Sequence, residues 1–87
     1  MELEKIKKEL ESNNYLTYIR NIDKSDKYIF SGIAEKETLM KPNFSFNIFI
    51  IENKIKLNYF EGHLLKEHFF DETKLLLEFV KKKFPIN

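Results

Sequence analysis

The sequence contains no cysteine and no tryptophan, and it has only two glycines, two prolines and one arginine among its 87 residues. The absence of cysteine excludes disulfides, thiol nucleophiles and thiolate metal ligands. Small secreted domains commonly depend on disulfides, so this absence favours a cytoplasmic protein. The single arginine, Arg20, disfavours nucleic-acid recognition, because arginine supplies most bidentate contacts to phosphates and bases.

The chain also lacks a charge excess and long apolar runs. Its 15 basic and 14 acidic residues give a net charge of +1, which provides no long-range attraction to nucleic acid, membranes or acidic substrates. No stretch approaches the ~18 apolar residues of a membrane span, and the N-terminal segment MELEKIKKEL lacks the apolar core of a signal peptide. We therefore expect a cytoplasmic protein with no membrane partner.

What the chain does contain is apolar and aromatic material, with 43% hydrophobic residues, nine Phe and four Tyr. This composition argues against disorder, and the length predicts one domain, residues 1–87, with a single core. The abundance of Lys, Asn and Ile is typical of A/T-biased coding and favours a bacterial, phage or mobile-element origin. The lysines are therefore not by themselves a functional signal.

A β-hairpin over residues 43–60 is the clearest local pattern. Apolar residues alternate on both sides of Glu52-Asn53, and successive strand side chains point to opposite faces. Asn accepts the positive φ of a tight turn. A turn at Glu52-Asn53 predicts three apolar cross-strand pairs on one core face: Ile50 with Ile55, Ile48 with Leu57, and Phe46 with Tyr59.

The remaining segments predict two further strands and two helices. An apolar stripe with a 3.6-residue period predicts a helix over Glu2–Ser12. A wide apolar arc ended by Pro85 predicts a second helix over Glu72–Phe84. Asp71 is the expected N-cap of this second helix, with a hydrophobic staple between Phe70 and Leu75. The segment Glu61–Phe70 reads as a loop with one helical turn. The expected strands are Tyr15–Arg20, Tyr28–Glu35 with a bulge or the close approach of a helix at Gly32, and the hairpin, which Pro42 precedes.

The fold class expected from this order is α+β, with a four-stranded antiparallel meander packed against an N-terminal and a C-terminal helix. The simplest arrangement places both helices on the core face of the hairpin. The element order is then α-β-β-β-β-α.

No catalytic, cofactor or metal motif emerges from the sequence. His63, Glu67 and His68 have the wrong spacing for a helical metal site, because positions five apart on a helix point about 140° apart. Asp23 and Asp26 are typical turn residues. No Ser, Thr or Lys has the neighbours of an activated nucleophile. We predict a protein that is not an enzyme.

The second sheet face is the feature that needs explanation. If both helices cover the core face, an apolar surface remains that is large enough to mark an interaction site. Tyr15 and Ile19 join it in one orientation of the first strand, and Phe60 lies at its rim. A helix on each face, or the Glu61–Phe70 segment folding back, would instead cover it. The predicted protein-binding residues are Ile29, Ile33, Phe49, Ile51, Lys54, Lys56 and Asn58.

These features favour a small protein-binding module that blocks a target sterically, as an inhibitor, immunity or anti-defence protein of a bacterium, phage or mobile element does. The partner is then another protein or a second copy in a homodimer. Two alternatives remain: a single-stranded nucleic-acid binder that uses aromatic and Lys side chains of the same face, and a metal or acid–base site at the histidines.

Overall fold

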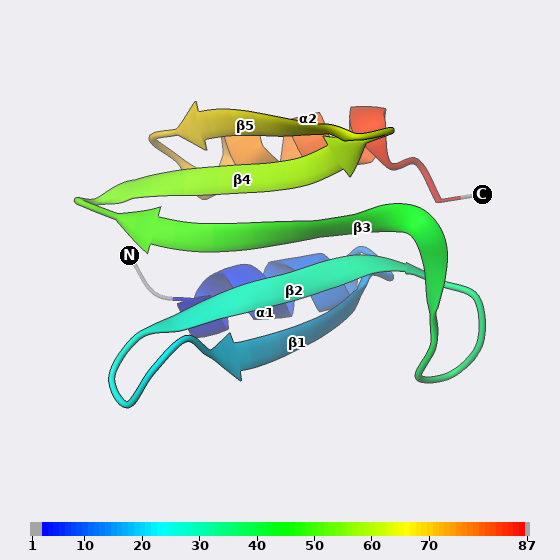
Figure 1. Ribbon diagram of the computed structural model, residues 1–87, viewed down its shortest axis with the longest axis horizontal. Helices are drawn as coiled ribbons and strands as arrows, with labels where there is room; N and C mark the ends of the chain where they lie inside the picture. The colour runs from blue at the N-terminus through cyan, green and yellow to red at the C-terminus, as the bar shows by residue number, and fades with distance from the viewer. Residues whose placement is uncertain (1–2, 87) are drawn as a thin grey trace.

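The computed structural model describes residues 3–86 and shows two helices and one five-stranded antiparallel sheet (Figure 1). The strands pair strictly in chain order, so the sheet is a meander, and the expected α+β class is confirmed. The expected number of four strands is wrong. The elements are α1 (Leu3–Ser12), β1 (Leu16–Asn21), β2 (Lys27–Ala34), β3 (Met40–Ile51), β4 (Lys54–Glu61), β5 (Leu64–Phe70) and α2 (Thr73–Lys83).

The additional strand is β5, in the segment expected to be a loop. Gly62 has a φ of +64°, and the chain then returns along β4 without a break, from Glu61 opposite Leu64 to Ile55 opposite Phe70. Glycine reaches this left-handed conformation without steric cost, which makes the tight turn favourable. The segment therefore neither forms a helical turn nor folds back over the sheet.

Both helices lie on the same face of the sheet, behind it in Figure 1, with α1 over β1 and β2 and α2 over β4 and β5. This arrangement confirms the expected placement of the helices. Their apolar sides meet the sheet in one continuous core. The fully buried aliphatic residues of that core are Ile6, Leu10, Ile29, Ile48, Ile55, Leu57, Leu76 and Val80.

The central hairpin has the predicted register. Ile48 lies opposite Leu57 and Ile50 opposite Ile55, and the turn residues Glu52 and Asn53 have φ values of 49° and 66°. Two consecutive positive φ values give the turn the twist that matches the flanking strands. The hairpin therefore presents one uninterrupted apolar row to the helices.

A bulge separates the two halves of the β2–β3 pairing. Gly32 lies opposite Ser45, but Ala34 lies opposite Met40, so β3 carries extra residues at this point. The bulge expected at Gly32 is thus confirmed. A Cβ atom at Gly32 would lie 2.4 Å from the carbonyl oxygen of Phe44, so the close approach at this glycine is made by the backbone of β3 and not by a helix. Pro42 lies within this bulged part of β3 and not before the strand, because a bulge tolerates a residue without an N–H.

The residue just before β1, Tyr15, is attached to the end of α2 by a buried hydrogen bond. The Tyr15 hydroxyl donates to the Phe84 carbonyl oxygen at 2.6 Å, and burial raises the pKa of Tyr15. Tyr15 and Ile19 therefore belong to the helix-covered side, not to the opposite face. The N-cap of α2 is Glu72 in place of Asp71, which removes the expected staple.

Candidate functional site

The sheet face that points away from α1 and α2, called the open face below, carries the candidate site. Side chains alternate along each strand, so the residues next to the core positions point to this face. Neither helix covers it. Its apolar residues come from all five strands: Leu16, Tyr18, Tyr28, Phe30, Phe49, Ile51, Phe60, Leu65 and Phe69.

Five of the seven predicted binding residues lie together on the open face, namely Phe49, Ile51, Lys54, Lys56 and Asn58. All five come from the central hairpin, where apolar and polar residues alternate regularly enough to predict which face each side chain occupies.

The other two predicted residues, Ile29 and Ile33, are not on the open face. Ile29 is fully buried in the core, and Ile33 packs against the core while partly buried. The β2–β3 register, with Ile29 opposite Ile48, places these residues under the helices. Tyr28 and Phe30 take their place on the open face.

A layered stack of side chains occupies the centre of the open face. Phe49 on β3 stacks with Tyr28 on β2, with the ring centroids 5.2 Å apart and the planes 15° from parallel. From the other side, the Lys56 ammonium lies 4.9 Å from the centre of the Phe49 ring. Both faces of this ring are therefore already in contact, and its edge points to solvent.

Arg20 forms a second such contact near the β1 edge. Its guanidinium carbon lies 4.2 Å from the centre of the Phe30 ring, which holds the side chain against the sheet. The described residues place no carboxylate within 4 Å of this guanidinium, whereas Lys56 pairs with Glu67 at 3.5 Å and Lys54 with Asp71 at 3.4 Å. The Arg20 guanidinium is therefore available to a negatively charged group of a molecule that binds to the open face.

The most exposed apolar side chains of the open face lie on β4, β5 and the end of β3. Their exposed fractions are 40% for Ile51, 65% for Phe60, 49% for Leu65 and 57% for Phe69. Phe60 and Leu65 lie directly opposite each other and form a ridge. Of these four residues, Leu65 and Phe69 were not predicted, because they lie on β5, where the sequence predicts a loop.

The histidines do not form a metal centre. His63 lies in the exposed turn between β4 and β5, and His68 stacks on Tyr59 with 5.8 Å between ring centroids and contacts Phe79 at 4.5 Å. Glu67 points to the opposite face and pairs with Lys56. Within residues 3–86, no group of three or more His, Asp or Glu side chains is placed to hold a metal ion.

The acidic cluster between β1 and β2 is a turn, as predicted. The Asp23 carboxylate accepts hydrogen bonds from the backbone N–H groups of Asp26 and Ser25, both at 2.9 Å, and these bonds lower the pKa of Asp23. This is the ordinary backbone chemistry of an Asx turn.

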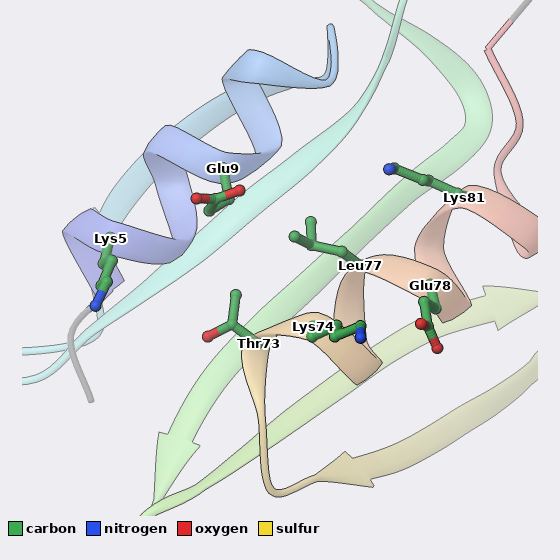
Figure 2. A pocket seen from close by; sticks show the side chains of 7 residues that line it. All are labelled: Lys5, Glu9, Thr73, Lys74, Leu77, Glu78 and Lys81. Carbon is green, nitrogen blue, oxygen red and sulfur yellow. The ribbon is translucent and has the colours of Figure 1, made fainter.

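A hollow of about 720 Å³ lies between α1 and α2 (Figure 2). Leu77 points across it toward α1, and the other lining side chains are mostly long and charged: three lysines and two glutamates. Charges of both signs alternate around its rim. The hollow therefore has no converging set of polar groups that would fix the orientation of a ligand.

No family model, curated protein or solved structure shows significant similarity to this chain. Within residues 3–86, neither α1 nor α2 has the length and apolar character needed to cross a membrane.

Proposed function

We propose that this chain is a non-enzymatic protein-binding module whose open face docks flat against a protein surface. The observation that supports it is the pre-arranged aromatic centre, the Tyr28–Phe49–Lys56 stack, next to the exposed side chains of Phe60 and Phe69. Rigid aromatic anchors surrounded by polar groups are typical of the energetic centres of protein interfaces. The action of such a module on a target is steric.

The size of the open face fits this proposal. Five strands at ~4.8 Å spacing and four rows of outward side chains cover roughly 500 Å², and the apolar side chains make up a part of this area, beside polar ones such as Lys56, Asn58 and Glu67. Exposed apolar patches of a few hundred Å² on monomers usually mark interaction sites. The polar members, such as the hydrogen-bonded pair Asn47 and Asn58 at 3.1 Å, lie among the rings and limit the loss of solubility.

The packing of the rings favours protein over single-stranded nucleic acid. A base stacks on the free face of an aromatic ring. Tyr28 and Lys56 contact Phe49 from its two sides, and Arg20 covers Phe30, so these rings offer edges. The net charge of +1 supplies no excess of cations for phosphates.

Site-specific photocross-linking tests the proposal. A benzophenone amino acid replaces Phe69 on the open face or, as a matched control, Leu75 on α2, which is 45% exposed. In cells that express the full chain, we expect protein adducts from position 69, their loss when Phe49→Asp is added, and few from position 75.

Equal adducts from both positions, or none from position 69, would reject the proposal. Adducts that nuclease treatment removes would instead establish the nucleic-acid alternative.

A further inference from the structure

We propose that the docked protein contributes an extended segment, which pairs with β5 as a sixth strand of the sheet. This inference rests on the proposed function and names the part of the partner that is bound. β5 forms one edge of the sheet, and β1 forms the other (Figure 1). An edge strand accepts an added strand when its outer backbone groups and its two flanks are open.

The register of the β4–β5 hairpin shows which backbone groups of β5 point outward. Pairs in an antiparallel ladder alternate between those that exchange hydrogen bonds and those whose N–H and C=O groups point away from the partner strand. The two-residue turn Gly62-His63 is closed by Glu61 and Leu64, so this pair is hydrogen-bonded. The outward-pointing residues are then Leu65, Glu67 and Phe69. Within residues 3–86, no turn, loop or cap bond uses their backbone groups.

The side chains beside these backbone groups are apolar on both sides of the sheet. Leu65 and Phe69 lie on the open face, and Leu64, which is 64% exposed, lies on the helical side. β5 contains no proline and no bulge, two features that protect sheet edges from pairing. An extended segment fits this edge, because it pairs with the line of backbone groups while its side chains point alternately to both sides.

The other edge strand, β1, is less accessible. Its apolar residues Leu16, Tyr18 and Ile19 are half-buried. The Tyr18 hydroxyl donates to the Thr38 carbonyl oxygen of the β2–β3 loop at 3.3 Å, and α1 packs against the strand from the core side. We therefore place the added strand at β5.

Charge specifies the chemistry of the added strand. Lys66 points to the helical side and is half-buried, and the described residues place no carboxylate within 4 Å of its ammonium. In an antiparallel sixth strand, the residue opposite Lys66 is therefore Asp or Glu. The residues opposite Leu65 and Phe69 are apolar. The residue between these positions, opposite Glu67, carries no negative charge.

A second copy of β5 does not have this sequence. The two-fold pairing that uses all three outward-pointing residues places the two Glu67 side chains opposite each other. Like charges directly opposite each other destabilise a pair of strands. The same pairing places His68 opposite Lys66, so it supplies no acid for this lysine. The added strand therefore belongs to a different protein.

Two photocross-linking positions test the added strand in cells that express the full chain. A benzophenone amino acid replaces Phe69 on the open face or Leu64 on the helical side. Because a sixth strand contacts both sides of the sheet, we expect both positions to give adducts with the same protein. Docking of the open face alone would give adducts from position 69 and not from position 64.

Proline substitution tests the backbone pairing. Glu67→Pro removes an outward N–H group and places a ring where the added strand lies, so it should lower the adduct yield from position 69 roughly tenfold. Glu67→Thr is the matched control, because it keeps the N–H group, and it should retain the yield.

Charge reversal tests the expected acid. Lys66→Glu places two acids opposite each other and should lower the yield roughly fivefold. Lys74→Glu changes an exposed charge on α2 and should leave the yield unchanged. An equal yield from both variants would overturn the expected acid opposite Lys66.

Urea unfolding of the proline variants tests which backbone groups point outward. Glu67→Pro should unfold near the midpoint of the parent, because proline is tolerated where the N–H faces solvent. Lys66→Pro should lower the midpoint strongly, because this N–H belongs to the ladder with Tyr59. If Glu67→Pro also loses the fold, its N–H is used within the sheet, and the inference is overturned.

The outcomes separate this inference from the proposed function. Adducts from position 69 that Glu67→Pro leaves unchanged would overturn the sixth strand and leave the proposed function intact. Adducts with twice the mass of the chain would identify a second copy as the occupant and would also overturn the inference. If position 69 yields no adduct with any protein, both proposals fail.

Discussion

Placing the same charge at two successive positions of β3 tests the two-sided nature of the sheet. Ile48 is fully buried under the helices, and its neighbour Phe49 is part of the open face. Ile48→Asp and Phe49→Asp introduce the same side chain into the same strand. The two variants differ in the face to which the new carboxylate points and in the apolar side chain that is removed.

The expected costs differ by at least a factor of two. At position 48, an unpaired carboxylate enters the core and an aliphatic side chain is lost, which costs about 4 kcal/mol or more. At position 49, the loss is the stacking with Tyr28, about 1 kcal/mol, and the contact with Lys56, about 0.5–1 kcal/mol. The new carboxylate stays in water beside the Lys56 ammonium.

Urea unfolding followed by far-ultraviolet circular dichroism measures the free energy of unfolding of both variants. A domain of this size has roughly 4–13 kcal/mol of stability, so Ile48→Asp should be largely unfolded before urea is added. Phe49→Asp should keep the parent spectrum and an unchanged m-value, with a free energy of unfolding about 2 kcal/mol lower. Equal losses at the two positions would refute the assignment of the faces.

Three further substitutions test individual features of the fold. Gly32→Ala should lower the free energy of unfolding by about 1–3 kcal/mol, because the new Cβ meets the Phe44 carbonyl oxygen, a backbone atom that cannot rotate away; thermal unfolding measures this, and an unchanged midpoint would contradict the close approach. Tyr15→Phe should cost about 1–2 kcal/mol in urea unfolding, since the Phe84 carbonyl oxygen loses its buried donor; a neutral effect would mean that another donor replaces it. Lys83→Gln should raise the pKa of Glu61 toward its ordinary value, because the Lys83 ammonium donates a hydrogen bond to that carboxylate and lowers its pKa. The contribution of this pair is present at neutral pH and is lost as the pH falls through the lowered pKa of Glu61, which NMR titration follows directly.

The central hairpin could be predicted from the sequence because its two signals agree. Apolar residues alternate on both strands, and Glu52-Asn53 allows the positive φ values that this turn adopts. The register and the core face followed from these two facts. The binding residues taken from this hairpin are therefore the ones that the structure brings together.

Strand β5 could not be predicted from the sequence because its apolar and polar residues do not alternate regularly. Leu64-Leu65 and Phe69-Phe70 each place one apolar residue on each face, so the period of two is lost. The one sequence feature that indicates a hairpin here is Gly62, in the short turn that precedes Leu64. The same loss of phase in β2, where Tyr28 and Phe30 alternate with Ile29 and Ile33, led to the wrong face for the two isoleucines.

The lack of regular apolar/polar alternation along these strands is itself informative about function. Strands that are buried on both faces read as nearly continuous apolar runs, whereas strands with one solvated face alternate. By this criterion β2 and β3 near Ile48–Ile51 have the sequences of strands covered on both sides. The two helices cover only the core face. The β2–β3 loop contacts the open face near β1, where the Tyr18 hydroxyl donates to the Thr38 carbonyl oxygen at 3.3 Å. We therefore propose that a second polypeptide covers the rest of this face, and photocross-linking from position 69 tests that proposal.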